Sequence, residues 1–505
     1  MLSHKLFSVQ RILLRLYRKH GPFRLYAASF LLSVTACLSL GILTLFSIFA
    51  GPFQDQLGYS QATINRIIIF QMLGMNLCTP LSGYIADAKG IWILSAMAFV
   101  GYLAGFNLIF LIIKAKLDHT MMYLAFFIMG CSHASLIFSC LLNSAKSLGR
   151  YYRTLSISTP NMMVSFAGFL EIQIFNTFFH DSSNPSRSFF NILRFFWYTL
   201  ACSTVISLMA CRLTDTVEKF EEDSGHTEHE DFNSFDASPL LTGAGVVIHS
   251  PSGSILGSPR SWYVEDPSSV LNLDMELSTD SVSDIFDPQL SYRQKVSLFL
   301  KDPLMYPLLC CCFMSIGATE FFIANMSSIL RDLFLKQLDS DLKVLSVTST
   351  ITRFLIMVLT DYCCVKFHVS RLTIFTATVI LCGFGHLYLS SAPLAGINFH
   401  LVVVSNAILS SSVFTLVPAI LASLYGLNIL GTTWGIFASS SIVGQLFLNF
   451  LYSIDYGQNC MTVARDGLVI CSTLTFFVSG CILLVLGITI MFLRKSYLVR
   501  ADEFF

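Results

Sequence analysis

Twelve long apolar runs, six on each side of an acidic segment, restrict what this chain can fold into more than any other feature. Each run is close to the ~20 residues that an α-helix needs to cross the hydrocarbon core of a bilayer. Because lipid offers no hydrogen bonds, a spanning segment must pair its own backbone groups, and a single run does so as a helix. The sequence therefore predicts an all-α membrane protein with twelve transmembrane helices in two halves of six.

The composition agrees with a lipid bilayer as the surroundings of the chain. The 505 residues are 54% hydrophobic and 12% charged, whereas soluble proteins carry about 25% charged residues. The first half is predicted to cover residues 25–211 and the second half residues 303–493. The predicted spans are 25–50, 61–86, 91–113, 121–145, 156–179 and 189–211, followed by 304–329, 342–361, 371–391, 399–424, 432–454 and 468–493.

The acidic segment, residues 212–302, is predicted to be a disordered linker between the halves. Sixteen Asp or Glu residues lie between positions 215 and 290, against Lys219 and Arg260 alone. Such a segment has too little apolar surface to offset the entropy that ordering would cost. The leader, residues 1–24, holds six Lys or Arg and no acid, and basic segments of this kind stay on the cytosolic side. We therefore expect the leader, the linker and the tail at residues 494–505 to be cytosolic.

Several function classes find no support in the sequence. The net charge of +0 gives no sign of a nucleic-acid partner. Many of the 15 cysteines, such as Cys310, Cys311 and Cys312, fall inside apolar runs, and no matched Cys-x-x-Cys pairs predict a metal site. No nucleophile elbow or Gly-rich phosphate loop indicates an enzyme or a cofactor. No filter sequence or repeated acid ring indicates a channel.

One loop motif points to a carrier with moving halves. Residues 83–90 (GYIADAKG) lie between the second and third spans and resemble the signature loop of the major facilitator superfamily. Gly83 permits close helix approach, while Asp87 can pair with basic groups or with a neighbouring helix N-terminus. The alternative is a helix-terminal Asp in an ordinary turn. A looser counterpart in the second half runs from Arg353 to Asp361 and Lys366. Gly83, Asp87, Gly90 and Asp361 are therefore gating candidates in a fold whose halves rock about a midplane site.

Four ionisable residues inside the predicted spans are candidates for the transport chemistry, because a charge in lipid is costly unless it is paired or faces water. Arg353 lies near the middle of the eighth span, and its guanidinium would suit a carboxylate substrate. The alternative is an internal ion pair of Arg353 with Glu320 or Glu171, and the two roles are compatible if the pair opens on substrate entry. Glu320 or Glu171 could carry a coupling proton. His133 is a packed polar residue or a proton relay.

A further resemblance narrows the family. Residues 414–420 (FTLVPAI), 425–426 (YG) and 431–437 (GTTWGIF) resemble the fungal monocarboxylate-permease homologues, a subgroup related to the nodulin-like carriers. Residues 41–53, 74–90 and 317–320 with Asn325 resemble the same family, so the likeness covers about 25–493 apart from the linker. The resemblance implies a probable transporter of the fungal vacuolar membrane, in a subgroup whose substrate is not established. A small organic anion as substrate, with protons as the candidate coupling ion, is carried over from the more distant monocarboxylate carriers. It also makes Asn325 a substrate-binding candidate, in addition to Arg353 and Glu320.

Two departures separate this chain from animal-type monocarboxylate carriers. Those carriers place an Asp four residues before the Arg of the eighth helix, where this chain has Ser349. Their motif at the first helix has no counterpart around residues 24–28. A second class of function also stays open, a non-transporting nutrient sensor that signals through the linker. Its Ser-Pro pairs at 238–239, 250–251 and 258–259 could be phosphorylated to regulate the protein or dock a partner.

Overall fold

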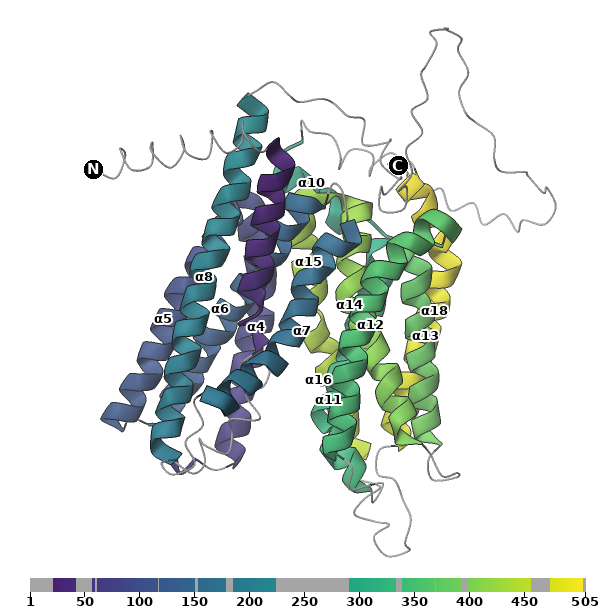
Figure 1. Ribbon diagram of the computed structural model, residues 1–505. Helices are drawn as coiled ribbons and strands as arrows, with labels where there is room; N and C mark the ends of the chain where they lie inside the picture. The colour runs from purple at the N-terminus through teal and green to yellow at the C-terminus, as the bar shows by residue number, and fades with distance from the viewer. Residues whose placement is uncertain are drawn as a thin grey trace, which may run out of the picture.

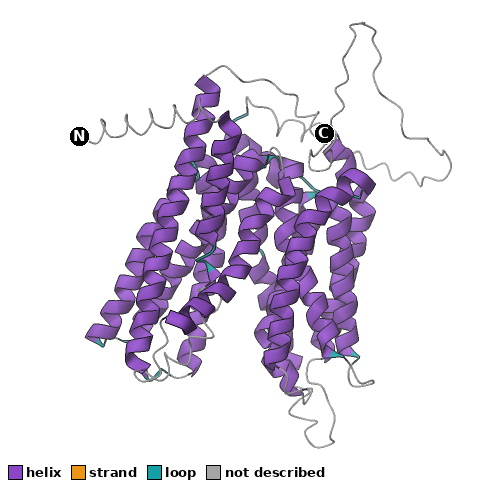
Figure 2. Ribbon diagram, viewed as in Figure 1, coloured by secondary structure: helices purple, strands orange, loops and turns teal. Residues whose placement is uncertain are grey.

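The structure is a computed structural model of the chain. It describes residues 21–41, 57–59, 61–116, 118–149, 153–178, 185–223, 290–332, 338–367, 369–391, 398–455 and 473–502. Every regular element in these ranges is a helix (Figure 2). The all-α class is therefore confirmed.

Two helical bundles stand side by side (Figure 1). The first half begins with a helical segment at 21–37. It continues with α4 (Gln61–Lys89), α5 (Trp92–Ala115), α6 (Thr120–Leu148), α7 (Arg153–Phe178) and α8 (Pro185–Asp223). The second half consists of α10 (Tyr292–Lys301), α11 (Met305–Asp332), α12 (Leu338–Phe367), α13 (Arg371–Ser390), α14 (Phe399–Tyr425), the short 3-10 helix η4 (Leu427–Ile429), α15 (Leu430–Ser439), α16 (Ser441–Asp455) and α18 (Thr473–Asp502).

Ten helical stretches of the described residues are long and apolar enough to cross a membrane, and each overlaps a predicted span. The fifth predicted span is present as α7 but is not among these ten. Of the first predicted span, the structure describes only residues up to 41. The chain is thus a multi-pass membrane protein, and the count of twelve spans stays a prediction.

The predicted linker is helical at both of its ends. At the first end, α8 continues to Asp223. Within this extension, the Arg212 guanidinium lies 3.7 Å from the centre of the Trp92 ring, and Val217 is buried. At the other end, α10 starts on a capping box of Ser291 and Gln294. Contacts with the bundle stabilise these two helical ends. The acidic composition of the whole segment does not predict such contacts, so it did not predict the helices. Residues 224–289 lie outside the described residues.

The halves meet through two sets of helices, with α4 packed on α15 and α7 packed on α12 and α14. We call the end of the bundle at which α8 ends and α10 begins the linker end; it is at the top of Figure 1. The ribbons of α7 and α12 lie closest near the linker end and diverge away from it (Figure 1). The contacts between the halves at the linker end are the first part of the candidate site.

Candidate gate and substrate site

Asp87 lies near the end of α4 and binds the start of α15 in the other half. Its Oδ2 accepts hydrogen bonds from Thr432 N at 2.6 Å and Thr432 Oγ1 at 2.8 Å, and its Oδ1 accepts one from Gly431 N at 3.2 Å. The first N–H groups of a helix have no partner within the helix, and they carry partial positive charge. Asp87 therefore caps α15 from the opposite half with charge-assisted hydrogen bonds.

Glycines bring the backbones of α4 and α15 together beside this contact. A Cβ added at Gly83 would lie 2.0 Å from the Gly431 carbonyl oxygen, far inside van der Waals contact. A Cβ added at Gly435 would lie 3.0 Å from the carbonyl oxygen of Thr79. Gly90, directly after α4, has a φ of 106°, a backbone conformation that side chains disfavour. The helices can meet this closely only because these positions carry no side chain.

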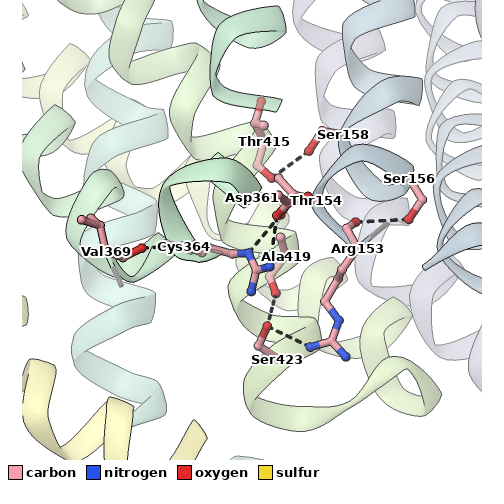
Figure 3. Close-up of polar contacts among 11 residues, drawn as sticks. Arg153, Thr154, Ser156, Ser158, Asp361, Cys364, Val369, Thr415, Ala419 and Ser423 are labelled. Carbon is pink, nitrogen blue, oxygen red and sulfur yellow. Dashed lines mark hydrogen bonds and ion pairs between the residues drawn. The ribbon is translucent and has the colours of Figure 1, made fainter. Parts of the chain in front are cut away.

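Asp361 forms the matching contact from the second half. Its Oδ1 accepts a hydrogen bond from Thr154 Oγ1 at 2.6 Å (Figure 3). The same oxygen lies 3.1 Å from Nη2 of Arg371. Arg371 Nε also donates to Thr154 Oγ1 at 3.0 Å. Nearby, Arg153 Nη1 donates to Ser423 Oγ at 3.2 Å (Figure 3). Thr154 and Arg153 open α7, so both Asp residues bind the start of a helix in the opposite half.

The two contacts follow one pattern. Asp87 lies near the end of the second predicted span of its half, and Asp361 near the end of the second predicted span of the other half. Each binds the start of the fifth predicted span across the interface, α15 or α7. We call these two contacts the Asp87 pin and the Asp361 pin. Their relation is what an internal repeat predicts.

The helix α10 joins the Asp87 pin. The Tyr292 hydroxyl is hydrogen-bonded to Thr432 Oγ1, and its ring meets that of Tyr84 edge-on, with 5.6 Å between the centroids. Burial raises the pKa of Tyr292 to about 12, and the negative charge of Asp87 acts in the same direction. At the end of α10, Asp302 Oδ2 accepts a hydrogen bond from Tyr425 OH at 2.6 Å. The helix is thus fixed to the second half while it contacts Tyr84 of the first.

Arg353 lies midway along α12, 15 residues after Leu338 and 14 before Phe367. Its Nη1 donates to the Asn161 carbonyl oxygen at 3.0 Å and to Ser165 Oγ, both on α7 of the other half. Its Cζ lies 5.9 Å from the centre of the Phe414 ring on α14. Its Nε is buried and has no hydrogen-bond partner. Within the described part of the chain, Arg353 forms no ion pair.

The other predicted candidates are not gathered around Arg353. Glu320 is half-buried midway along α11 and has no hydrogen bond to the described residues. The alternative of an Arg353–Glu320 ion pair is therefore not formed in this conformation. Asn325 Nδ2 donates to Asn449 Oδ1 at 3.1 Å, so it joins α11 to α16. The side chain of Glu171 lies outside the described residues.

His133 is buried in the first half, as the packed alternative expects. Its Nδ1 lies 3.3 Å from the Tyr102 hydroxyl, and its Nε2 has no partner. Nothing among the described residues links it to Arg353, which leaves the proton-relay role without a connection across the interface.

Sequence reasoning missed Asn161, Ser165 and Phe414. Asn161 and Ser165 are four residues apart and therefore lie on one face of α7. A pair of small polar side chains at this spacing, just after Pro160, was the available signal. Neither Asn161 nor Ser165 carries a charge, so charge alone does not identify the two residues as partners of Arg353.

A family model and several curated proteins are similar in sequence to this chain. The Nodulin-like family model matches residues 24–258. A relative named Probable transporter MCH1 from Wickerhamomyces anomalus is 24% identical over 448 residues, covering 88% of this chain and 82% of its own length. The protein of the same name from Saccharomyces cerevisiae is 25% identical over 465 residues, covering 87% and 86%.

Solved structures share the fold. The proton:xylose symporter XylE matches with a TM-score of 0.57 at 12% identity, covering 94% of this chain and 96% of its own. The transporter FucP, in the outward conformation, matches with a TM-score of 0.53 at 11% identity, covering 92% and 99%.

Two helical halves that meet at one end give this chain the fold of the major facilitator superfamily, as the solved structures show. The chain is similar to the fungal proteins named probable transporter MCH1, so the predicted resemblance to monocarboxylate-permease homologues is confirmed. The names of these relatives describe probable transporters rather than enzymes, which fits the prediction of a non-enzyme.

Proposed function

We propose that the protein is a secondary transporter of a small organic anion of the monocarboxylate type, working by alternating access. The observation that carries this proposal is the unpaired edge of Arg353 at the interface of the halves. Nη1 is bound to α7, whereas neither Nε nor Nη2 has a hydrogen bond to the described residues. The N–H groups of Nε and Nη2 point along one edge of the guanidinium and match the two oxygens of a carboxylate.

An aromatic pair near the Arg353 guanidinium supports an organic rather than an inorganic anion. Phe414 lies beneath the Arg353 guanidinium, and its ring meets that of Trp434 edge-on with 6.2 Å between the centroids. Arg353 would hold the carboxylate while the rings cover a small apolar body. Both rings belong to the second half, so anion and body would bind mainly to one half.

The two pins supply the alternation. They close the linker end in this conformation, and they must open when the opposite end closes. We assign the linker end to the cytosol, because basic segments are retained there. By the resemblance to its fungal relatives, the membrane is proposed to be that of the vacuole. The state described is then the one that faces away from the cytosol.

We further propose proton coupling through Glu320. A carboxyl group inside the membrane without a hydrogen-bond partner is costly when charged, so it gains and loses its proton in step with its access to water. XylE is named a proton symporter, which is a statement about that protein alone. Glu171 is the second candidate for this role.

Flux into proteoliposomes tests the proposal. A panel of labelled organic anions, including lactate, is offered with and without a pH gradient. Arg353→Lys keeps the charge but loses the two-pronged contact, so we expect normal abundance and a KM raised about tenfold or more. Glu320→Gln should keep anion exchange and lose the response to the pH gradient. Normal flux by Arg353→Ala at normal abundance would contradict the anion site. A folded wild-type protein that moves none of the anions would favour the sensor alternative, which no relative's name supports.

A further inference from the structure

We propose that Ser165 and Asn161 are positioning residues for Arg353: they hold Nη1 from the opposite half and so present the Nε–Nη2 edge to the substrate carboxylate. This inference rests on the proposed function. Sequence patterns did not assign the two residues, and neither carries a charge. Their role follows from which guanidinium nitrogen they occupy.

The geometry leaves one edge of Arg353 for a ligand. The Asn161 carbonyl oxygen and Ser165 Oγ both accept from Nη1, and Ser165 Oγ lies 3.3 Å from the same carbonyl oxygen. Nη1 is the nitrogen on the side of the Arg353 stem, so the two acceptors occupy the edge that a carboxylate does not need. The nitrogens left over are the two that form a parallel fork.

Asn161 also sets the wall of the site. Its Nδ2 donates to the Phe414 carbonyl oxygen at 3.0 Å, across the interface to α14. One residue of α7 thus fixes both the guanidinium and the backbone of the ring beneath it. A change in α7 should therefore alter the orientation of the fork before it alters the fold.

The same contact couples anion binding to the movement of the halves. Arg353 belongs to the second half, and both acceptors belong to the first, so a movement that separates the halves at the level of Arg353 breaks this contact. Breaking the contact leaves a half-buried cation with fewer partners, which is costly. A bound carboxylate supplies a replacement partner that moves with Arg353. The loaded carrier should then rock faster than the empty one, which favours exchange over net flux.

Two variants of Ser165 and one matched control separate positioning from general packing. Ser165→Ala removes the hydroxyl, and Ser165→Thr restores it. The control is Ser158→Ala, which removes another cross-half bond of α7, from Ser158 Oγ to the Thr415 carbonyl oxygen at 3.1 Å, without touching Arg353. Each full-length protein is purified, its thermal stability is measured, and labelled lactate is used as the transport probe.

The first measurement does not need transport. Phenylglyoxal adds to guanidinium groups, and mass spectrometry of the peptide containing Arg353 gives its rate of modification. Ser165→Ala should raise that rate about tenfold, as loss of one hydrogen bond worth about 1.4 kcal/mol would do. Ser165→Thr and Ser158→Ala should react like the wild type. An unchanged rate in Ser165→Ala overturns the positioning role.

The second measurement is the lactate KM and the ratio of exchange to net flux. Ser165→Ala should raise KM about tenfold with little change in the maximal rate, the pattern of lost binding, and should lower the ratio of exchange to net flux. Equal effects of Ser165→Ala and Ser158→Ala on KM would overturn the proposal. If the phenylglyoxal rates differ as expected but no panel anion is moved by the wild type, the proposed function fails and the positioning of Arg353 stands.

Discussion

Thr432 and Asp87, from opposite halves, share two hydrogen bonds, because Thr432 N and Oγ1 both donate to Asp87 Oδ2. The Thr432 hydroxyl proton is used by Asp87, so the hydroxyl of Tyr292 must be the donor in its bond to Thr432 Oγ1. The order of donation therefore runs from α10 through α15 to the end of α4. A single carboxylate holds the start of one helix and, through it, a second helix that follows the linker.

Removing the charge of Asp87 should open the linker end. Asp87→Asn keeps the size of the side chain but loses charge-assisted bonds to the α15 N-terminus, worth about 1.5–3 kcal/mol each. We expect hydrogen exchange at the amides of Gly431 and Thr432 to increase about tenfold or more at unchanged thermal stability. The control is Asp118→Asn, at the start of α6 and away from α15, where exchange at 431–432 should not change. Unchanged exchange in Asp87→Asn would show that the pin does not hold the closed state.

A methyl group at Gly83 should block closure without unfolding the protein. In Gly83→Ala the new Cβ would lie 2.0 Å from the Gly431 carbonyl oxygen, in the other half. The halves can separate at the linker end to relieve this clash, so we expect lower flux and faster exchange at 431–432. In Gly74→Ala the new Cβ would lie 2.2 Å from the Phe127 carbonyl oxygen within the first half. That clash has no such relief and should lower thermal stability and abundance instead. Equal loss of stability in both variants would contradict a contact that opens.

The hydrogen bond between Tyr292 of α10 and Thr432 should not depend on pH near neutrality. The pKa of Tyr292 is raised to about 12 by burial, so its contribution is fully present below about 10, the unfolded pKa of Tyr, and is lost only as pH rises through the folded value. The protection that Tyr292 gives the amides at 431–432, measured as the ratio of the exchange rates of Tyr292→Phe and wild type at each pH, should therefore be constant between about pH 6 and pH 9. Tyr292→Phe removes one hydrogen bond and should raise that exchange several-fold at every pH. A pH-dependent difference between Tyr292→Phe and wild type in this range would mean that another group controls the contact.

The motif residues of the gate could be predicted because they combine a signature spacing with simple physics. A Gly at residue 83 and an Asp at residue 87 imply a close helix crossing and an acid at a helix end, and the structure has both beside α15. Which helix N-terminus Asp87 would meet could not be predicted, because that depends on how the second half packs. Asp361 and Thr154 show the same limit, with a partner 207 residues away along the chain.

The partners of Arg353 could not be predicted from charge. The sequence indicates Glu320 and Glu171 as partners of Arg353, because an acid gives a visible signal in an apolar run. The structure instead satisfies Nη1 with a backbone oxygen and the Ser165 hydroxyl. Similarly, the acidic composition of residues 212–302, taken as a whole, does not predict α10. The structure shows a short packed helix there, with a capping box and the buried Phe299.

The Asp361 pin should be weaker across the interface than the Asp87 pin. Asp361 keeps a partner in its own half, Arg371, even when Thr154 is removed. Thr154→Val should therefore leave thermal stability unchanged, while weakening the closed state by about 1–3 kcal/mol, the net value of the two hydrogen bonds that Thr154 Oγ1 makes with Asp361 and Arg371. Hydrogen exchange in residues 153–157 should increase, and Thr154→Ser should restore the wild-type rate.

Because both pins close the same end, the free-energy effects of Thr154→Val and Asp87→Asn on the closed state should add in the double variant if the two sites do not otherwise interact. The double variant should also lose more flux than either single variant, since a carrier that cannot close its linker end cannot complete the cycle. The measurement is a double-mutant cycle on exchange at 153–157 and 431–432, with lactate flux alongside. If Thr154→Val lowers thermal stability while exchange at both segments stays unchanged, the Asp361 contact only supports the second half, and the Asp87 pin alone closes the linker end.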